Sequence, residues 1–394
     1  MKKLYVFACI LLLSASIQAQ SFRVTKTVVN SSITDTCFSF PDSITSVSLH
    51  SDEAIDFTDI LIISDSATYI PHKEGIDTET ENGMWSELII FKHPQTHLCI
   101  SKPAHKSITF SGIYVQPFTK TEKPSTVQLK SSSCSNVPSM IYQEEWRTGL
   151  PAPDYERIYT ETKNIIIHHS AGSNSEANYT DVIRNIYTYH TEIREWDDIG
   201  YNYLIAQNGV IYAGRDPGEF PQDMVQGAHF SGNNAHTLGI CVLGNYEEVS
   251  VPDTAYQSLQ KLITWKCAKD SLQPLLTAPH PLNSKLPVIA GHTDGAATLC
   301  PGDYLYNSLP ILRNEVADSL RQCGYTIATD LPEIAFHNQT SKKQFISDTE
   351  LCYVFTIQGQ LIAIDIFEKL RHYMENPMYV IVPIKNGKSS THKF

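Results

Sequence analysis

The middle of the chain, residues 140–326, constrains the fold most, because apolar strand-like runs alternate there with amphipathic helical segments. Asn208 and Gly209 join two of the expected strands, and this dipeptide is typical of β-hairpin turns. Strands are expected over residues 163–169, 203–207, 210–213 and 237–243, and helices over residues 179–195, 254–268 and 309–320. The expected fold class of this domain is α/β, a mixed β-sheet flanked by helices.

The regions on both sides read as β structure. Residues 21–125 show short apolar runs separated by Ser, Thr, Asp, Gly and Pro, which predicts an all-β domain with a sandwich as its expected form. Residues 126–139, rich in Lys, Ser and Thr, read as a linker. Residues 331–394 predict a small β module. A chain of 394 residues, 42% of them hydrophobic, is long enough for cores in more than one domain.

Residues 1–20 have the pattern of a secretory signal peptide. Two lysines precede an apolar run from Leu4 to Leu13, which is too short to cross a membrane, and small and polar residues follow. No later stretch of about 18 apolar residues is present. We therefore expect an exported protein without an integral membrane segment in the mature chain, located in the periplasm, on the outer surface or outside the cell.

The net charge and the cysteine content limit which binding partners and which cellular compartment can be expected. The formal net charge is −12 and no basic run stands out, so nucleic acid is not expected as a partner. Nine cysteines less Cys9 of the signal peptide leave eight, which would suit disulfides in an oxidising compartment, but their spacing is irregular. Cys241 lies in an apolar run and is expected to be a small buried hydrophobe.

One group of residues has the character of a catalytic zinc site, which uses three protein ligands and keeps a fourth position for water. His168 and His169 end the expected strand, and His292 and Cys300 frame a loop further along the chain. Two ligands close together on a loop and one on a distant strand could occupy three of the four positions of a tetrahedral zinc site. The His292–Cys300 spacing alone is weak support, since a chain with 15 His and nine Cys contains such spacings by chance.

The surrounding sequence strengthens this interpretation. The relevant segments are residues 165–172 (IIIHHSAG), 196–205 (WDDIGYNYLI), 208–215 (NGVIYAGR), 227–229 (GAH), Asn234 with 238–246 (LGICVLGNY), 291–294 (GHTD) and 300–302 (CPG). In this order they resemble the peptidoglycan recognition protein and N-acetylmuramoyl-L-alanine amidase type 2 family.

The resemblance implies a function and a set of site residues. His168, His292 and Cys300 fall on the family's zinc-ligand positions, with one Zn²⁺ per catalytic domain. Tyr201 matches the family's catalytic Tyr, and Thr298 matches a position that contacts the reacting oxygen. Cytoplasmic relatives carry Asp at the third ligand position, so Cys300 points to the exported branch. The implied reaction is hydrolysis of the amide bond between N-acetylmuramic acid (MurNAc) and L-alanine, with peptidoglycan or muropeptides as the partner.

The charge of the ligand set suggests how this reaction would proceed. Two neutral imidazoles and one thiolate would leave a net charge of about +1 on a zinc site, which brings the pKa of a bound water towards ~7 and makes hydroxide available. Tyr201, which has no basic pKa, is expected to donate a hydrogen bond to that water or to the developing oxyanion, with Thr298 as a second donor.

Several residues keep two interpretations. His169 is either a structural histidine or a substrate-facing one, and His229 either lines the substrate groove or is an ordinary surface histidine. Asn234 either contacts the peptide or caps a turn. Cys300 could instead form a disulfide with Cys267 or Cys323, which would abolish the site.

The function of the protein also keeps more than one interpretation. A non-catalytic muropeptide receptor and a surface adhesin are the alternatives to an amidase, and receptors of this family typically lose the Cys or a His. Residues 216–218 (DPG) depart from the residue pair by which eukaryotic recognition proteins sort diaminopimelate from lysine stem peptides, so that preference does not carry over.

The tail from Leu351 is similar either to the sorting domain of the type 9 secretion route or to an ordinary β module. The N-terminal β domain could bind glycan or a partner, or hold the protein at a surface.

Overall fold

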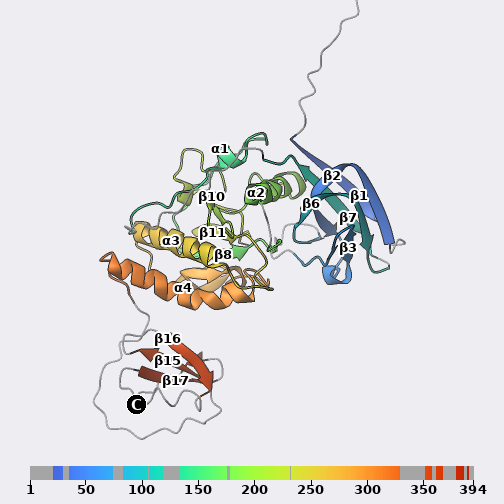
Figure 1. Ribbon diagram of the computed structural model, residues 1–394. Coiled ribbons are helices and arrows are strands. Elements are labelled where there is room, and N and C mark those ends of the chain that lie inside the picture. The colour runs from blue at the N-terminus through green and yellow to red at the C-terminus, as the bar shows by residue number, and fades with distance from the viewer. Residues whose placement is uncertain are drawn as a thin grey trace, which may run out of the picture.

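The chain folds into three regions that follow one another in sequence (Figure 1). The computed structural model describes residues 21–29, 35–73, 83–104, 106–118, 134–174, 178–230, 232–328, 351–356, 361–366, 379–385 and 388–389, the last four ranges as backbone only. An all-β region comes first, then an α/β region, then a small β module, which confirms the predicted fold class. The predicted signal peptide and most of the predicted linker lie outside the described residues.

The α/β region is built on one mixed five-stranded sheet of order β10-β9-β11-β8-β14. Its strands are β8 (Asn164–His169), β9 (Tyr203–Ile205), β10 (Ile211–Ala213), β11 (Thr237–Val242) and β14 (Ile289–Gly291). The β9–β10 pair is antiparallel, and the other pairs are parallel. Gly209 in the hairpin turn has φ +84°, a conformation that favours glycine, as the turn dipeptide predicted.

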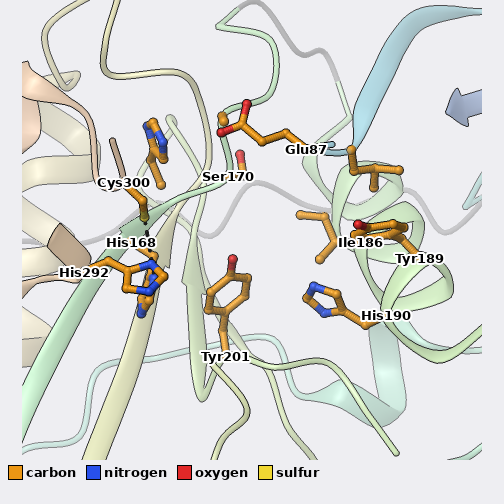
Figure 2. A pocket seen from close by; sticks show the side chains of 12 residues that line it. Glu87, His168, Ser170, Ile186, Tyr189, His190, Tyr201, His292 and Cys300 are labelled. Carbon is orange, nitrogen blue, oxygen red and sulfur yellow. Dashed lines mark hydrogen bonds between the residues drawn. The ribbon is translucent and has the colours of Figure 1, made fainter. Parts of the chain in front are cut away.

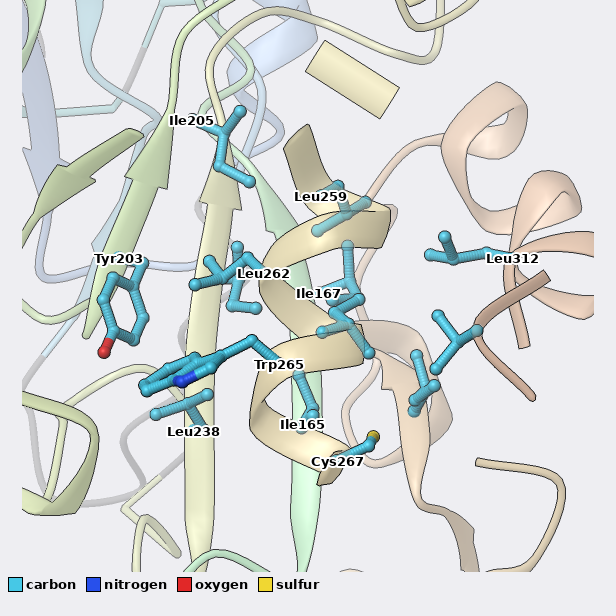
Figure 3. Close-up of a cluster of buried hydrophobic side chains, with 14 of the residues drawn as sticks. Ile165, Ile167, Tyr203, Ile205, Leu238, Leu259, Leu262, Trp265, Cys267 and Leu312 are labelled. Carbon is cyan, nitrogen blue, oxygen red and sulfur yellow. The ribbon is translucent and has the colours of Figure 1, made fainter. Parts of the chain in front are cut away.

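Helices cover both faces of this sheet. On one face, α3 (Asp253–Asp270) and α4 (Asp303–Gln322) pack on alternate strand residues such as Ile165 and Ile167, with Leu262 and Leu312 among their contacts (Figure 3). On the other face lies α2 (Tyr179–Thr188), which continues into the π-helical turn η2 (Tyr189–Ile193). Because side chains alternate along a strand, His168 points to the face opposite α3 and α4.

Some local features differ from the sequence-based expectation. The helix expected over residues 309–320 begins at Asp303, because Pro310 is accommodated inside α4 rather than marking its start. The hairpin of β12 (Thr277–His280) and β13 (Asn283–Pro287) and the short β14 were not predicted, since Pro and Gly interrupt the apolar pattern there. Short helices complete the region: α1 (Gln143–Trp146), η3 (Gln222–Met224) and η4 (His292–Asp294).

The all-β region forms one antiparallel sheet instead of the expected two-sheet sandwich. Its strands are β1 (Phe22–Val29), β2 (Asp35–Ser51), β3 (Leu61–Ser64), β4 (Thr68–Tyr69), β5 (Met84–Trp85), β6 (Ile89–Ser101) and β7 (Ile108–Val115), and η1 (Phe57–Asp59) precedes β3. Register shifts between β2 and β6 bend the long β2, so that a single sheet can enclose a core around Phe57 and Phe110. A disulfide joins Cys37 and Cys99 across β2 and β6.

The all-β region and the α/β region share a buried core. Leu88, Ile90 and Ile113 of the first pack with Ile186 and Tyr189 of the second. Polar contacts fix the same interface, because the hydroxyls of Thr45 and Ser46 donate to Asn185 Oδ1 at 2.6 and 2.9 Å. The all-β region is thus held against α2 rather than joined to it only by the chain.

The last segments of the chain add a disulfide and a small sheet. Cys134, inside the predicted linker, is buried and bonded to Cys323 just after α4. The small β module consists of β15 (Leu351–Thr356), β16 (Leu361–Ile366), β17 (Tyr379–Lys385) and β18 (Lys388–Ser389) in an antiparallel sheet. Among the described residues, no helix combines the length and apolar character needed to cross a membrane.

Candidate metal centre

The sheet topology brings two of the three expected zinc ligands together. β8 and β14 are neighbouring parallel strands, and Ile167 is paired with Gly291. His168 is the next residue on β8, and His292 directly follows the end of β14 as the first residue of η4, so both lie at the same edge of the sheet. Their ring centroids lie 4.6 Å apart, and both residues are buried.

The loop after β14 delivers the third expected ligand, Cys300. The loop is closed by a hydrogen bond of 2.9 Å from Thr293 N–H to the Cys300 carbonyl. Asp294 fixes its start, because one carboxylate oxygen accepts from Gly291 N–H at 2.9 Å and the other from the Tyr306 hydroxyl at 2.6 Å. Cys300 Sγ lies 3.6 Å from His168 Nδ1.

The three side chains fit a zinc ion. One potential ligand atom each of His168, His292 and Cys300 lies within 4.8 Å of the other two. Zinc prefers such nitrogen and sulfur donors. The alternative prediction, a disulfide from Cys300 to Cys267 or Cys323, is wrong. Cys323 is bonded to Cys134, and both Cys267 and Cys300 are free thiols.

Burial controls the protonation of His168 and Cys300. Desolvation, with smaller contributions from His292 and His229, holds the pKa of His168 well below its usual value, so its imidazole is neutral and able to bind a metal. Burial likewise raises the pKa of the Cys300 thiol well above its usual range. Metal binding would therefore displace a proton from Cys300.

His229 is buried behind the metal ligands rather than placed on an open groove. Its Nδ1 lies 3.1 Å from His168 Nε2, and its Nε2 lies 3.3 Å from the Thr237 hydroxyl. Gly239 on β11 allows this approach, because a Cβ there would lie 2.4 Å from the His229 ring. Asn234 Oδ1 accepts from the backbone N–H groups of His229 and Phe230 at 2.7 and 2.8 Å, so it shapes the turn that carries His229.

The remaining expected site residues lie in two places. Tyr201 and His169 line the cavity beside the metal ligands, and Tyr246 N–H donates to His169 Nδ1 at 3.3 Å. Thr298 lies on the loop before Cys300, and its hydroxyl accepts from Cys300 N–H at 3.1 Å. Figure 2 shows the Tyr201 hydroxyl directed into the space between the metal ligands and α2.

The cavity also contains residues that the sequence did not point to. It measures about 50 Å³, and its described lining consists of Glu87, Leu88, His168, His169, Ser170, Ala171, Ile186, Tyr189, His190, Tyr201, His292 and Cys300. Glu87 and Leu88 come from the all-β region, and Figure 2 shows Glu87 reaching toward Ser170. Only the packing of two regions brings these residues here, so no local sequence signal could have found them.

Comparison with known proteins places the α/β region in a family. The family model described as N-acetylmuramoyl-L-alanine amidase matches residues 159–303. Peptidoglycan recognition protein 1 of Bos taurus is 30% identical over 171 residues, covering 43% of this chain and 80% of the relative. Peptidoglycan-recognition protein SC1a of Drosophila melanogaster is 32% identical over 146 residues, covering 36% and 70%.

A solved structure is similar over the same part of the chain. The crystal structure of human PGRP-IBETAC in complex with glycosamyl muramyl pentapeptide is 29% identical, with a TM-score of 0.36, and the match covers 43% of this chain and 93% of that one. The similarity to its sequence relatives shows that the chain belongs to the peptidoglycan recognition protein and N-acetylmuramoyl-L-alanine amidase family.

Proposed function

We propose that this protein is a zinc-dependent amidase that hydrolyses the bond between N-acetylmuramic acid and L-alanine in peptidoglycan. The observation that carries the proposal is the buried group of His168, His292 and Cys300, with ligand atoms within 4.8 Å of one another in a member of this family. A complete ligand set favours an enzyme over a receptor or adhesin that only binds cell wall.

The three ligands would hold the ion at the floor of the cavity. The chemistry that zinc supplies when bound is Lewis acidity, which activates water and polarises a carbonyl group. His229 would orient His168, since a hydrogen bond to the second ring nitrogen of a ligand histidine fixes its tautomer and its ring plane. His229 and Asn234, for which the sequence left substrate contact as one of two interpretations, are therefore proposed as positioning residues.

Tyr201 would be the catalytic hydrogen-bond donor. It lines the cavity, and its ring centroid lies 5.2 Å from that of His168. A tyrosine hydroxyl is protonated at neutral pH, so it can donate to an oxygen that gains negative charge during attack on the amide. Thr298 would hold the Cys300 loop through its existing hydrogen bond, and His169 would contact the substrate from the cavity wall.

We also propose that the protein works outside the cytoplasm. The disulfides Cys37–Cys99 and Cys134–Cys323 support this, because such bonds persist in oxidising compartments. Residues 1–20 would direct export as a signal peptide.

Digestion of purified peptidoglycan sacculi tests the proposed reaction. We expect release of stem peptides with a free L-alanine amino terminus, loss of release after chelation, and recovery on adding Zn²⁺. Tyr201→Phe should lower kcat by about 10²-fold or more, the usual effect of removing an oxyanion donor. Tyr203→Phe is the matched control, because the Tyr203 hydroxyl is buried against the other face of the sheet and has no hydrogen-bond partner in the described structure. Binding of sacculi without any metal-dependent release would identify a receptor instead.

A further inference from the structure

A second, larger cavity adjoins the metal cavity. It has a volume of about 760 Å³, within the range of pockets that hold small ligands. Glu87, Leu88 and Ala171 line both cavities, so the larger one is a groove that continues directly from the candidate metal centre.

The groove has walls from two regions of the chain. One wall belongs to the all-β region and includes Tyr69, the last residue of β4, and Ile70 and Pro71, which follow it. The other belongs to the α/β region and comprises residues 171–174 after β8 together with Asn245 and Glu248. The family match begins at residue 159, so the first wall is a feature of this chain outside the matched segment.

The first wall is held rigidly in place. Glu87 N–H donates to the His72 carbonyl at 2.9 Å, and Ser86 N–H donates to the Leu49 carbonyl at 2.9 Å. The Tyr189 hydroxyl, from the start of η2, donates to the Ser86 carbonyl at 3.3 Å. Glu87 and Leu88 are therefore fixed relative to both the sheet and the metal cavity.

The chemistry of the walls selects among the parts of a peptidoglycan substrate. Glu87 and Glu248 contribute carboxylates, and no Lys or Arg is among the described residues that line the groove. A stem peptide carries more free carboxylates than amines, because only its lysine or diaminopimelate side chain supplies a cation, so its net charge would be repelled there. A glycan strand is uncharged wherever the lactyl carboxyl is bound in the amide; its hydroxyls can donate to carboxylates, and its ring faces can pack on Tyr69 and Ile70.

We propose that this groove binds the glycan strand of peptidoglycan and that the all-β region is the element that recognises it. The inference rests on the proposed function, since it places the scissile amide in the adjoining metal cavity. It gives the all-β region a definite role: the protein should prefer stems on glycan chains to stems on a single sugar.

Binding of glycan without peptide tests the groove independently of catalysis. The probe is an oligosaccharide of alternating N-acetylglucosamine and N-acetylmuramic acid with its lactyl carboxyls amidated, measured by calorimetry on the full chain carrying Cys300→Ala. Glu248→Gln, an exposed and isosteric change, should weaken binding about tenfold, the usual scale for losing a hydrogen bond to a charged group. Glu144→Gln on α1, equally exposed and outside the groove, should leave the affinity unchanged.

Two further measurements keep the outcomes distinct. Tyr69→Ala should also weaken oligosaccharide binding about tenfold or more, and circular dichroism would show whether the variant is folded. In the catalytically intact chain, Glu248→Gln should raise KM for sacculi with little change in kcat, and leave KM for a single-sugar muropeptide unchanged. Equal oligosaccharide affinity in wild type and folded groove variants, or a free stem peptide that binds more tightly and loses affinity in them, would overturn the proposal. Glycan binding without hydrolysis would instead refute the amidase assignment alone.

Discussion

Two clusters of buried titratable side chains lie in the α/β region, and they differ in how their charges are balanced. In the first, His168, His292 and Cys300 meet, and burial lowers the pKa of His168 and raises the pKa of the Cys300 thiol. In the second, the fully buried Lys266 contacts Asp223 and Asp270, each at 2.6 Å. Lys269 adds a contact of 2.7 Å to Asp223.

The difference separates a structural cluster from a functional one. The Lys266 cluster is complete, because each buried charge faces an opposite charge that offsets its desolvation. The His168 cluster brings two imidazoles and one thiol together with no carboxylate or ammonium group among the three, an arrangement that a metal cation would complete. Substitutions should therefore affect metal binding in the first cluster and folding stability in the second.

The largest expected effect follows from removing the third ligand. Cys300→Ala should abolish zinc binding at stoichiometric concentration and reduce amidase activity to background, because two imidazoles alone hold the ion weakly. Cys267→Ala, at another free and buried thiol, should keep both. Metal content by mass spectrometry and peptide release from sacculi are the measurements. Full zinc occupancy of Cys300→Ala would show that the ligand assignment is wrong.

Removal of a charge from the second cluster should destabilise the fold. Asp223→Asn leaves the buried Lys266 with Asp270 alone and should lower the free energy of unfolding by about 3–5 kcal/mol, the scale for breaking a buried ion pair. Asp318→Asn, which breaks an exposed pair with Arg321, should cost less than about 1 kcal/mol. Urea denaturation of the zinc-loaded protein measures both. An unchanged zinc affinity in Asp223→Asn would support the separation of the clusters, and a large loss of affinity would contradict it.

A smaller effect is expected behind the metal ligands. His229→Gln removes the ring nitrogen that lies against His168 and should weaken zinc binding about 10- to 100-fold, as is usual for such outer partners. Competition with a chelator of known affinity measures this change. His280→Gln is the control, because His280 lies nearby against Phe230 and its Nε2 contacts the Asn233 carbonyl at 2.9 Å rather than a ligand. Equal zinc affinities in the two variants would remove His229 from the site.

The sequence predicted those parts of the site that depend on local order along the chain. His168 could be placed because a buried strand ends there, and the hairpin at Asn208 and Gly209 could be placed because the turn requires that chemistry. The sequence left the role of His229 open, since its burial depends on close packing against Gly239 of another strand. Glu87 could not be predicted, because its place in the cavity arises only when the all-β region packs against α2.

The smallest effect concerns pH and compares His190, a buried histidine that lines the metal cavity, with the Lys266 cluster. Burial, then Arg194 and Arg215, hold the pKa of His190 well below its usual value, so the folded state keeps it neutral while the unfolded chain binds a proton near pH 6.5. This contribution to stability is present above pH 6.5 and is lost as pH falls, by about 1.4 kcal/mol at pH 5.5.

The Lys266 cluster responds at lower pH. Although burial would raise the pKa of Asp223, Lys266 lowers it, so the Lys266 cluster loses stability only below the normal aspartate range, near pH 4. His190→Asn, whose Oδ1 replaces Nδ1 and can still accept the hydrogen bond from Gly200 N–H, should therefore show a smaller loss of unfolding free energy than wild type between pH 7.5 and 5.5. Urea denaturation of the chelated proteins at both pH values measures this difference, and identical losses would mean that His190 is protonated in the folded state as readily as in the unfolded chain.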